Sequence, residues 1–249
     1  MASATTVPST RTPEPVNSIG RIFGVLFSPK ATFESIARHP TWIAPLVVLS
    51  LLALGVVGIF THRGGWTSFY EKQMATNTRI QQMSLEQQQR VMEAQLKYTP
   101  PVAYVEAAIG PFLAALVVAA VFLGIFKGLG GAQFGFKTSL GIVSYAWVPG
   151  LIGALLAILV LTVKDVTTVD IQNVVASNAG AFVSSNSPKW MVALLGSLDL
   201  FSFWTMILMA IGYSAAAPKK LSFGKAFAWI LCAWALWVVV KVGLTAAFS

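Results

Sequence analysis

The side chains of this 249-residue chain that could carry out chemistry are few and widely separated. His39 and His62, the two histidines, flank the first long apolar stretch, and Cys232 is the single cysteine. Nucleophilic catalysis needs a nucleophile beside its base, and a zinc site needs several Cys or His ligands at short spacing. The glycine-rich segment 127–135 lacks the residue order of a phosphate-binding loop. We therefore predict no catalytic residue, no metal site and no cofactor, in a protein that is not an enzyme.

Two ionisable residues nevertheless lie inside apolar stretches. Asp199 is about nine residues into the stretch 190–213, and Lys241 is about six residues from the end of the stretch 226–248. A charge near the centre of a bilayer is unfavourable and usually faces protein or water. At ~1.5 Å per helical residue they lie roughly 13 Å and 9 Å below the same membrane surface, which makes them a candidate intramembrane polar pair. The alternative is that Lys241 extends to the interface while Asp199 bonds a neighbouring Ser or Tyr.

The elements that must position these residues are five long apolar stretches. They cover residues 41–60, 103–126, 140–163, 190–213 and 226–248. A helix of about 20 residues crosses the ~30 Å hydrocarbon core, and continuously apolar runs favour helices over the alternating strands of a barrel. Charged residues are 10% of the chain, and the mean hydropathy is +0.72. The predicted fold is all-α, a polytopic membrane helix bundle with five transmembrane helices.

The net charge of +8 is distributed unevenly between the two ends of these stretches. One end has Arg11, Arg21, Lys30, Arg38, Lys127, Lys137, Lys219, Lys220 and Lys225 in the N-terminal segment and the short connections. The positive-inside rule therefore predicts a cytoplasmic N-terminus and an extracytoplasmic C-terminus. We expect the cations to meet anionic headgroups of the lipid bilayer, and we predict no nucleic-acid partner.

The N-terminal region divides into a polar tract and a helix. Residues 1–18 are predicted to be a disordered tail, followed by a single membrane domain over 19–249. Ser28 as N-cap and Pro29 at the first helical position predict a helix start, with Phe33 and Ile36 on one face. This helix lies at the cytoplasmic interface with that face among the headgroups, or it packs under the bundle. The sequence leaves both arrangements open.

The first long connection, 61–102, is predicted to be an extracytoplasmic helical loop. Ser84 and Gln87 form a capping box that opens a helix running through Lys97. The segment Thr99-Pro100-Pro101 is expected to end that helix before the second apolar stretch. The other long connection, 164–189, shows no clear periodicity and is predicted to be a loop.

Small residues and a proline inside the stretches indicate where helices pack or bend. Gly124 and Gly128 form a small-xxx-small pattern, and Gly150 and Gly153 follow Pro149 in the third stretch. These glycines are expected to allow close approach of helices. Pro149 is expected to kink its helix, because proline lacks a backbone N–H.

Four short segments resemble the Yip1-domain membrane family. They are Leu-Phe-Ser-Pro-Lys-Ala-Thr-Phe at 26–33, His-Pro-Thr-Trp-Ile-Ala-Pro at 39–45, Ser-Tyr-Ala-Trp-Val-Pro at 144–149 and Asp-Leu-Phe-Ser-Phe-Trp at 199–204. The resemblance, to prokaryote-like members, implies five spans and the plasma (inner) membrane of a prokaryote. Eukaryotic members bind Rab-type GTPases in vesicle traffic and have an Asp-Leu-Tyr-Gly-Pro motif near the first span. This chain has no such motif there, so we do not transfer that role.

The sequence supports two candidate functions. The first is a non-enzymatic multi-pass scaffold or organiser of partner proteins or lipids. Its predicted partners are the lipid bilayer, and other membrane proteins or further copies of the chain. The second is a small transporter or channel component that uses Asp199 and Lys241.

Overall fold

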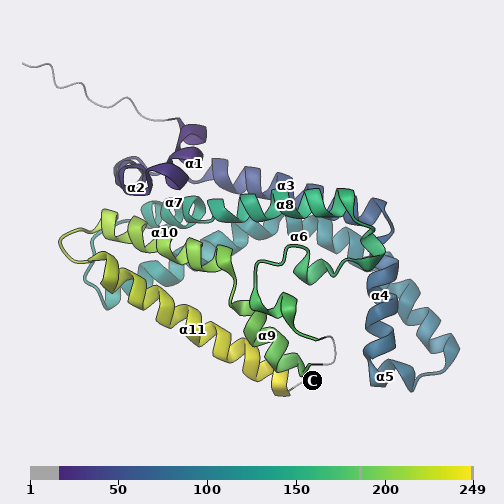
Figure 1. The fold of residues 1–249 in the computed structure, drawn as a ribbon. Coiled ribbons are helices and arrows are strands. Elements are labelled where there is room, and N and C mark those ends of the chain that lie inside the picture. The colour runs from purple at the N-terminus through teal and green to yellow at the C-terminus, as the bar shows by residue number, and fades with distance from the viewer. Residues whose placement is uncertain (1–16, 185–186, 248–249) are drawn as a thin grey trace, which may run out of the picture.

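The computed structural model describes residues 17–184 and 187–247, and the predicted disordered tail lies almost wholly outside them. The described chain is all-α, with three 3₁₀ turns in one connection (Figure 1). The elements are α1 (Ser18–Phe27), α2 (Pro29–Arg38), α3 (Ile43–His62), α4 (Gly65–Thr76), α5 (Thr78–Gln81), α6 (Leu85–Gly128), α7 (Phe136–Ala146), α8 (Val148–Val163), η1 (Val166–Thr168), η2 (Ile171–Asn173), η3 (Ala179–Phe182), α9 (Lys189–Ser197), α10 (Leu200–Ala216) and α11 (Phe223–Ala247).

Four segments of the described chain are long and apolar enough to cross a membrane: Ile43–His62, Leu85–Gly128, Phe136–Val163 and Phe223–Ala247. They confirm a polytopic helical membrane protein. Side chains such as Val117 on α6, Leu159 on α8 and Val239 on α11 are exposed although they are apolar. Water would penalise such surfaces, whereas lipid would not.

The prediction of a continuous helix over 190–213 is wrong. The chain there forms two helices, α9 and α10, with a break at Leu198 and Asp199. The break occurs because Asp199 leaves the helical conformation and its carboxylate accepts the N–H of Ser202, which makes it the N-cap of α10. The apolar helix α10 has 17 residues, the lower end of the range that spans a bilayer.

The third stretch also contains a break. Helix α7 ends at Ala146, Trp147 lies between the helices, and α8 starts at Val148 with Pro149 in its first turn. Proline cannot donate to the carbonyl four residues earlier, and its ring collides with that carbonyl. The interruption therefore lies just before Pro149, as a proline-induced kink requires.

Helix α6 differs from the prediction because it continues through Pro100 and Pro101, which do not end it. In Figure 1 its first part lies beside α4, away from the bundle, and the ribbon then turns to run along α3. Prolines bend helices, and water can bond the carbonyls that they leave free where these are exposed. We call residues 65–99, which comprise α4, α5 and the start of α6, the arm.

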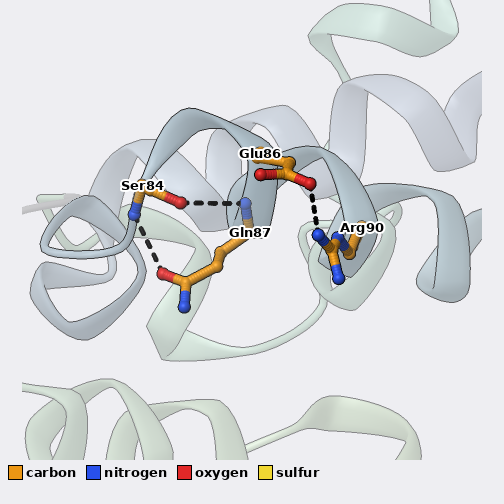
Figure 2. A network of polar contacts seen from close by, with 4 residues as sticks. All are labelled: Ser84, Glu86, Gln87 and Arg90. Carbon is orange, nitrogen blue, oxygen red and sulfur yellow. Dashed lines mark hydrogen bonds and ion pairs between the residues drawn. The ribbon is translucent and has the colours of Figure 1, made fainter.

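The start of α6 confirms the predicted capping box (Figure 2). The backbone N–H of Ser84 donates to Gln87 Oε1 at 3.0 Å, and the N–H of Gln87 donates to Ser84 Oγ at 3.3 Å. One turn further on, Arg90 and Glu86 form an exposed ion pair. Such a pair contributes less than about 1 kcal/mol, so the cap is the main local reason for the helix to begin here.

The helix predicted at Ser28 and Pro29 exists as α2, and it packs within the bundle. Phe33 and Ile36 are 0% exposed, so the interfacial alternative is wrong for this face. A Cβ added at Gly212 of α10 would lie 3.0 Å from the Phe33 ring, and one at Gly141 of α7 would lie 3.1 Å from Ile36. Glycine at these two positions is what lets α2 lie directly on α7 and α10.

The end of the bundle that carries α1 and α2 is strongly basic. Its described cations are Arg21, Lys30, Arg38, Lys127, Lys137, Lys219, Lys220 and Lys225, and its one described acid is Glu34. We call this region the basic end. Figure 1 places α1, α2 and the α10–α11 turn there and the arm at the opposite end. The remaining described acids lie toward the arm end: Glu71, Glu86, Glu93, Glu106, Asp165, Asp170 and Asp199.

Candidate functional site

The break between α9 and α10 is the place where polar groups and cavities coincide. Asp199 Oδ2 accepts the N–H of Ser202 at 2.8 Å, and Asp199 Oδ1 accepts the hydroxyl of Ser177 at 2.5 Å. The backbone is also paired, since Leu200 N–H donates to the Ser177 carbonyl at 3.0 Å. The 164–189 connection thus reaches the break and holds it. The carboxylate serves both as a helix cap and as a joint between these two segments.

Lys241 of α11 approaches the same break from the other side. Its Nζ donates to Ser197 Oγ at 3.2 Å, and Ser197 is the last residue of α9. No ion pair joins Asp199 to Lys241 among the described residues. The candidate pair is therefore not a direct contact, because each charge bonds a different serine. The bonds of Asp199 are those of the alternative reading, in which this carboxylate accepts from neighbouring serines.

Two cavities meet at Asp199. The first, of about 850 Å³, lies between α3, α6 and α8 and is lined mainly by small residues, with Glu106 on its wall. The second, of about 590 Å³, is more apolar and lies against α10 and α11, where Trp234 and Trp237 line it. Asp199 and Ser202 line both cavities. A broken helix beside a cavity is an arrangement that membrane proteins use to bind small ions or solutes.

The predicted packing glycines divide into two groups. Gly150 and Gly153 line the first cavity, and a Cβ at Gly153 would lie 3.3 Å from the Phe201 ring. Gly153 therefore allows α8 to approach the start of α10. Positions Gly124 and Gly128 have no atom within 4 Å of an added Cβ, so the close approach expected there is absent from the described residues. These two glycines are exposed at the end of α6, where no helix crosses them.

Arg21 is a structural residue that sequence reasoning missed. Its side chain is 2% exposed, and Nη1 donates to the His39 carbonyl at 2.8 Å and to Thr41 Oγ1 at 2.9 Å. Nη2 donates to Ser35 Oγ at 2.9 Å. Thr41 Oγ1 lies 3.1 Å from Tyr145 Oη. The guanidinium thus links α1, α2 and the entry to α3 with α7, using neutral acceptors.

Arg63 makes a comparable link at the arm end. Its Nη1 donates to the carbonyls of Leu161, Thr162 and Lys164, which are the free acceptors at the end of α8. Asp165 follows, and the N–H of Thr167 lowers the pKa of its carboxyl, helped by the nearby positive charges of Arg63 and Lys72. The ends of α3 and α8 next to the arm are therefore held together.

The role of Asp199 as a cap gives a testable expectation. Asp199→Ala removes the acceptor for both serines, and we expect the free energy of unfolding to fall by about 1–2 kcal/mol. Asp199→Asn keeps an acceptor oxygen and is expected to lose less than half of that amount. Thermal unfolding of the two variants in detergent measures the difference. Equal losses would show that the charge matters more than the cap, and would restore the ion-pair hypothesis.

The candidate spans, the basic end and the broken helix together define the class of protein. It is a polytopic helical membrane protein whose N-terminal helix pair is built into one end of the bundle. The Yip1 domain family matches residues 23–245, so the chain belongs to the Yip1 domain family. This match covers nearly the whole described chain and confirms the resemblance noted in the sequence. No curated protein and no solved structure matches the chain.

Proposed function

We propose that this Yip1-domain protein is a non-enzymatic membrane organiser. In this proposal the arm recruits a protein partner on the extracytoplasmic side, and the basic end rests on the cytoplasmic leaflet of a prokaryotic inner membrane. The family consists generally of non-enzymatic trafficking proteins, which favours an organising role over catalysis. The observation that carries the proposal is the arm, a folded helical surface outside the span bundle.

The arm is anchored firmly enough to present a defined surface. The rings of Phe60 and Trp66 meet edge to face with centroids 5.0 Å apart, and Trp66 meets Phe69 in the same way at 6.2 Å. Trp66 Nε1 also donates to Thr61 Oγ1 at 2.8 Å. Each such aromatic pair adds about 0.5–1.5 kcal/mol beyond area burial. Beyond this anchor the arm exposes polar side chains that are available to a partner, among them Gln82, Gln89 and Glu93.

The basic end supports contact with a membrane surface. Ile19, Phe23 and Phe27 are 64%, 59% and 81% exposed and share one face of α1, opposite the buried side of that helix. An apolar stripe flanked by cations is typical of helices that lie in the headgroup region of anionic membranes. Interfacial contact, one of the two arrangements that the sequence left open for α2, is thus better supported for α1.

Site-specific photo-crosslinking in native membranes tests the organising role. A photoreactive residue replaces Gln89 or Glu93, which lie one helical turn apart on the arm. In a matched control it replaces Val117, an exposed position on the lipid-facing part of the same helix. We expect both arm positions to give the same protein adduct, identified by mass spectrometry, and Val117 to give none. The proposal fails if the arm gives no adduct that Val117 lacks.

The alternative function, a small transporter or channel component, is favoured by one observation. Asp199 lies at a helix break between two cavities, as a coupling-ion site would. Proton flux into liposomes containing the purified protein, followed with an internal pH dye, distinguishes the two functions. Flux that disappears in Asp199→Asn would replace the organiser by the transporter.

A further inference from the structure

We infer that a groove between α2 and α10 binds an anionic phospholipid from the surrounding bilayer. The groove has a volume of about 890 Å³, and residues of the α10–α11 turn also line it. The inference goes beyond partner recruitment by the arm. It rests on the proposed function only in placing the basic end at a membrane surface.

The mouth of the groove has the chemistry of a phosphate-binding surface. Lys30 and Arg38 line it from α2, separated by eight residues and therefore on the same side of the helix. Both are exposed, and no ion pair involves either of them in the described residues. Glu34 lies between them and is likewise outside any ion pair there. Arg38 can bind a phosphate with two parallel N–H groups, and Lys30 adds a mobile point charge.

The surroundings of the mouth add further positive charge. Lys219, Lys220 and Lys225 lie in and beside the α10–α11 turn, whose residues Pro218 and Leu221 line the groove. Glu34 therefore reduces the local charge without reversing it. An anion is favoured over a neutral or cationic ligand at this position.

The remaining wall of the groove is apolar and follows a membrane helix. Ile207 and Ile211 are one turn apart on α10, and Phe223 at the start of α11 also lines the groove. From Ala216 back to Ile207 the helix covers about 13 Å, so the groove follows α10 for that length from the end of the bundle. A ligand that fills it has a charged head and an apolar chain.

These features of the groove favour one class of ligand. A free phosphate ion would leave the isoleucines uncovered, and a second copy of this chain would bring an equally basic end against the first. An anionic glycerophospholipid satisfies both parts of the groove, because its phosphate meets the cations and one acyl chain lies along α10.

Native mass spectrometry of the delipidated full chain in detergent tests the inference. The probes are phosphatidylglycerol and phosphatidylcholine with identical acyl chains. We expect phosphatidylglycerol to bind about tenfold more tightly, because the two cations near the headgroup outweigh the single acid Glu34. The double variant Lys30→Gln/Arg38→Gln should lose this preference. Glu34→Gln should strengthen it, because a repulsive charge is removed from the mouth.

The matched control is Lys127→Gln/Lys137→Gln, which removes the same charge from the same end but outside the groove. It should retain the preference within about twofold, since only longer-range interactions change. Equal binding of both lipids by the natural chain, or equal losses in the two double variants, would overturn the inference. Full displacement of phosphatidylglycerol by inorganic phosphate would also overturn it, because the site would then be one for a soluble anion. Thermal unfolding checks that each variant is folded.

The two experiments fail independently. Lipid binding in detergent does not depend on the arm or on membrane orientation, and arm crosslinking does not depend on the groove. A chain that crosslinks through its arm but shows no lipid preference would keep the organising role and lose the groove.

Discussion

Replacing Phe33 with alanine is expected to lower the free energy of unfolding by about 3–5 kcal/mol, the usual range for a buried phenylalanine. Its side chain is 0% exposed and lies over Gly212, beside Ile142. Truncation leaves a cavity where α2 meets α7 and α10, and the rigid helices around it cannot close the space. Unfolding of the purified chain by heat in a mild detergent measures the loss.

Phe23→Ala is the matched control for this experiment. Phe23 is the same residue type on the neighbouring helix α1, but it is 59% exposed. We expect a change within about 0.5 kcal/mol, since exposed substitutions seldom do more. If Phe33→Ala were equally mild, α2 would not be an integral part of the bundle, and the interfacial reading of this helix would return.

Replacing Arg21 with methionine is expected to have the second large effect, a loss of about 3 kcal/mol or more. The guanidinium donates to the carbonyl of His39 and to the hydroxyls of Thr41 and Ser35. Hydrogen bonds that involve a charged group contribute about 1.5–3 kcal/mol each, and the acceptors left behind would be unsatisfied. Methionine preserves much of the side-chain length, so lost bonding dominates the result.

Arg21→Lys separates charge from geometry. Lysine keeps the positive charge but cannot hold Ser35 and Thr41 with two separate groups of donors. We expect roughly half of the loss seen with methionine. If thermal unfolding shows the same stability for the natural chain and for Arg21→Met, this result would contradict a structural role for the residue. It would indicate that burying the charge cancels the gain from its bonds.

The apolar stretches were predictable from sequence because their length and continuity reflect the solvent around them. Four of the predicted stretches, 41–60, 103–126, 140–163 and 226–248, correspond to the candidate spans Ile43–His62, Leu85–Gly128, Phe136–Val163 and Phe223–Ala247, of which the third is interrupted at Trp147. The capping box at Ser84 was predictable for a similar reason, since both of its bonds are local in sequence. Features that depend only on residues within one helical turn, or on the membrane as the surrounding solvent, can be predicted from a single sequence.

Other features depended on partners distant in the sequence. The sequence predicts that Asp199 is a charge inside a continuous helix, whereas its side chain caps α10 and accepts from Ser177, 22 residues earlier. An Asp before an apolar run is an N-cap signal, but hydropathy averaged over the whole stretch concealed it. The buried position of Arg21 depends on Ser35, Thr41 and the α7 face, which no local pattern indicates.

The effects of the prolines also could be predicted from sequence only in part. Pro149 follows the interruption between α7 and α8, whereas Pro111 lies inside α6 without ending that helix. Pro100 and Pro101 do not end α6, although the same rule predicted that they would. They lie where α6 leaves the arm, and there water can satisfy what proline leaves unbonded. A proline's effect therefore depends on its surroundings as well as on its own geometry.

In the proposed orientation the basic end faces the cytoplasm and the arm faces the other side of the membrane. Single cysteines at Gln89→Cys in the arm and Lys137→Cys at the basic end, both in a Cys232→Ser background, test it with a membrane-impermeant maleimide. We predict that intact cells label position 89 and that position 137 reacts only after the membrane is permeabilised. Labelling of position 137 in intact cells, with position 89 protected, would contradict the orientation and the functions proposed for both ends.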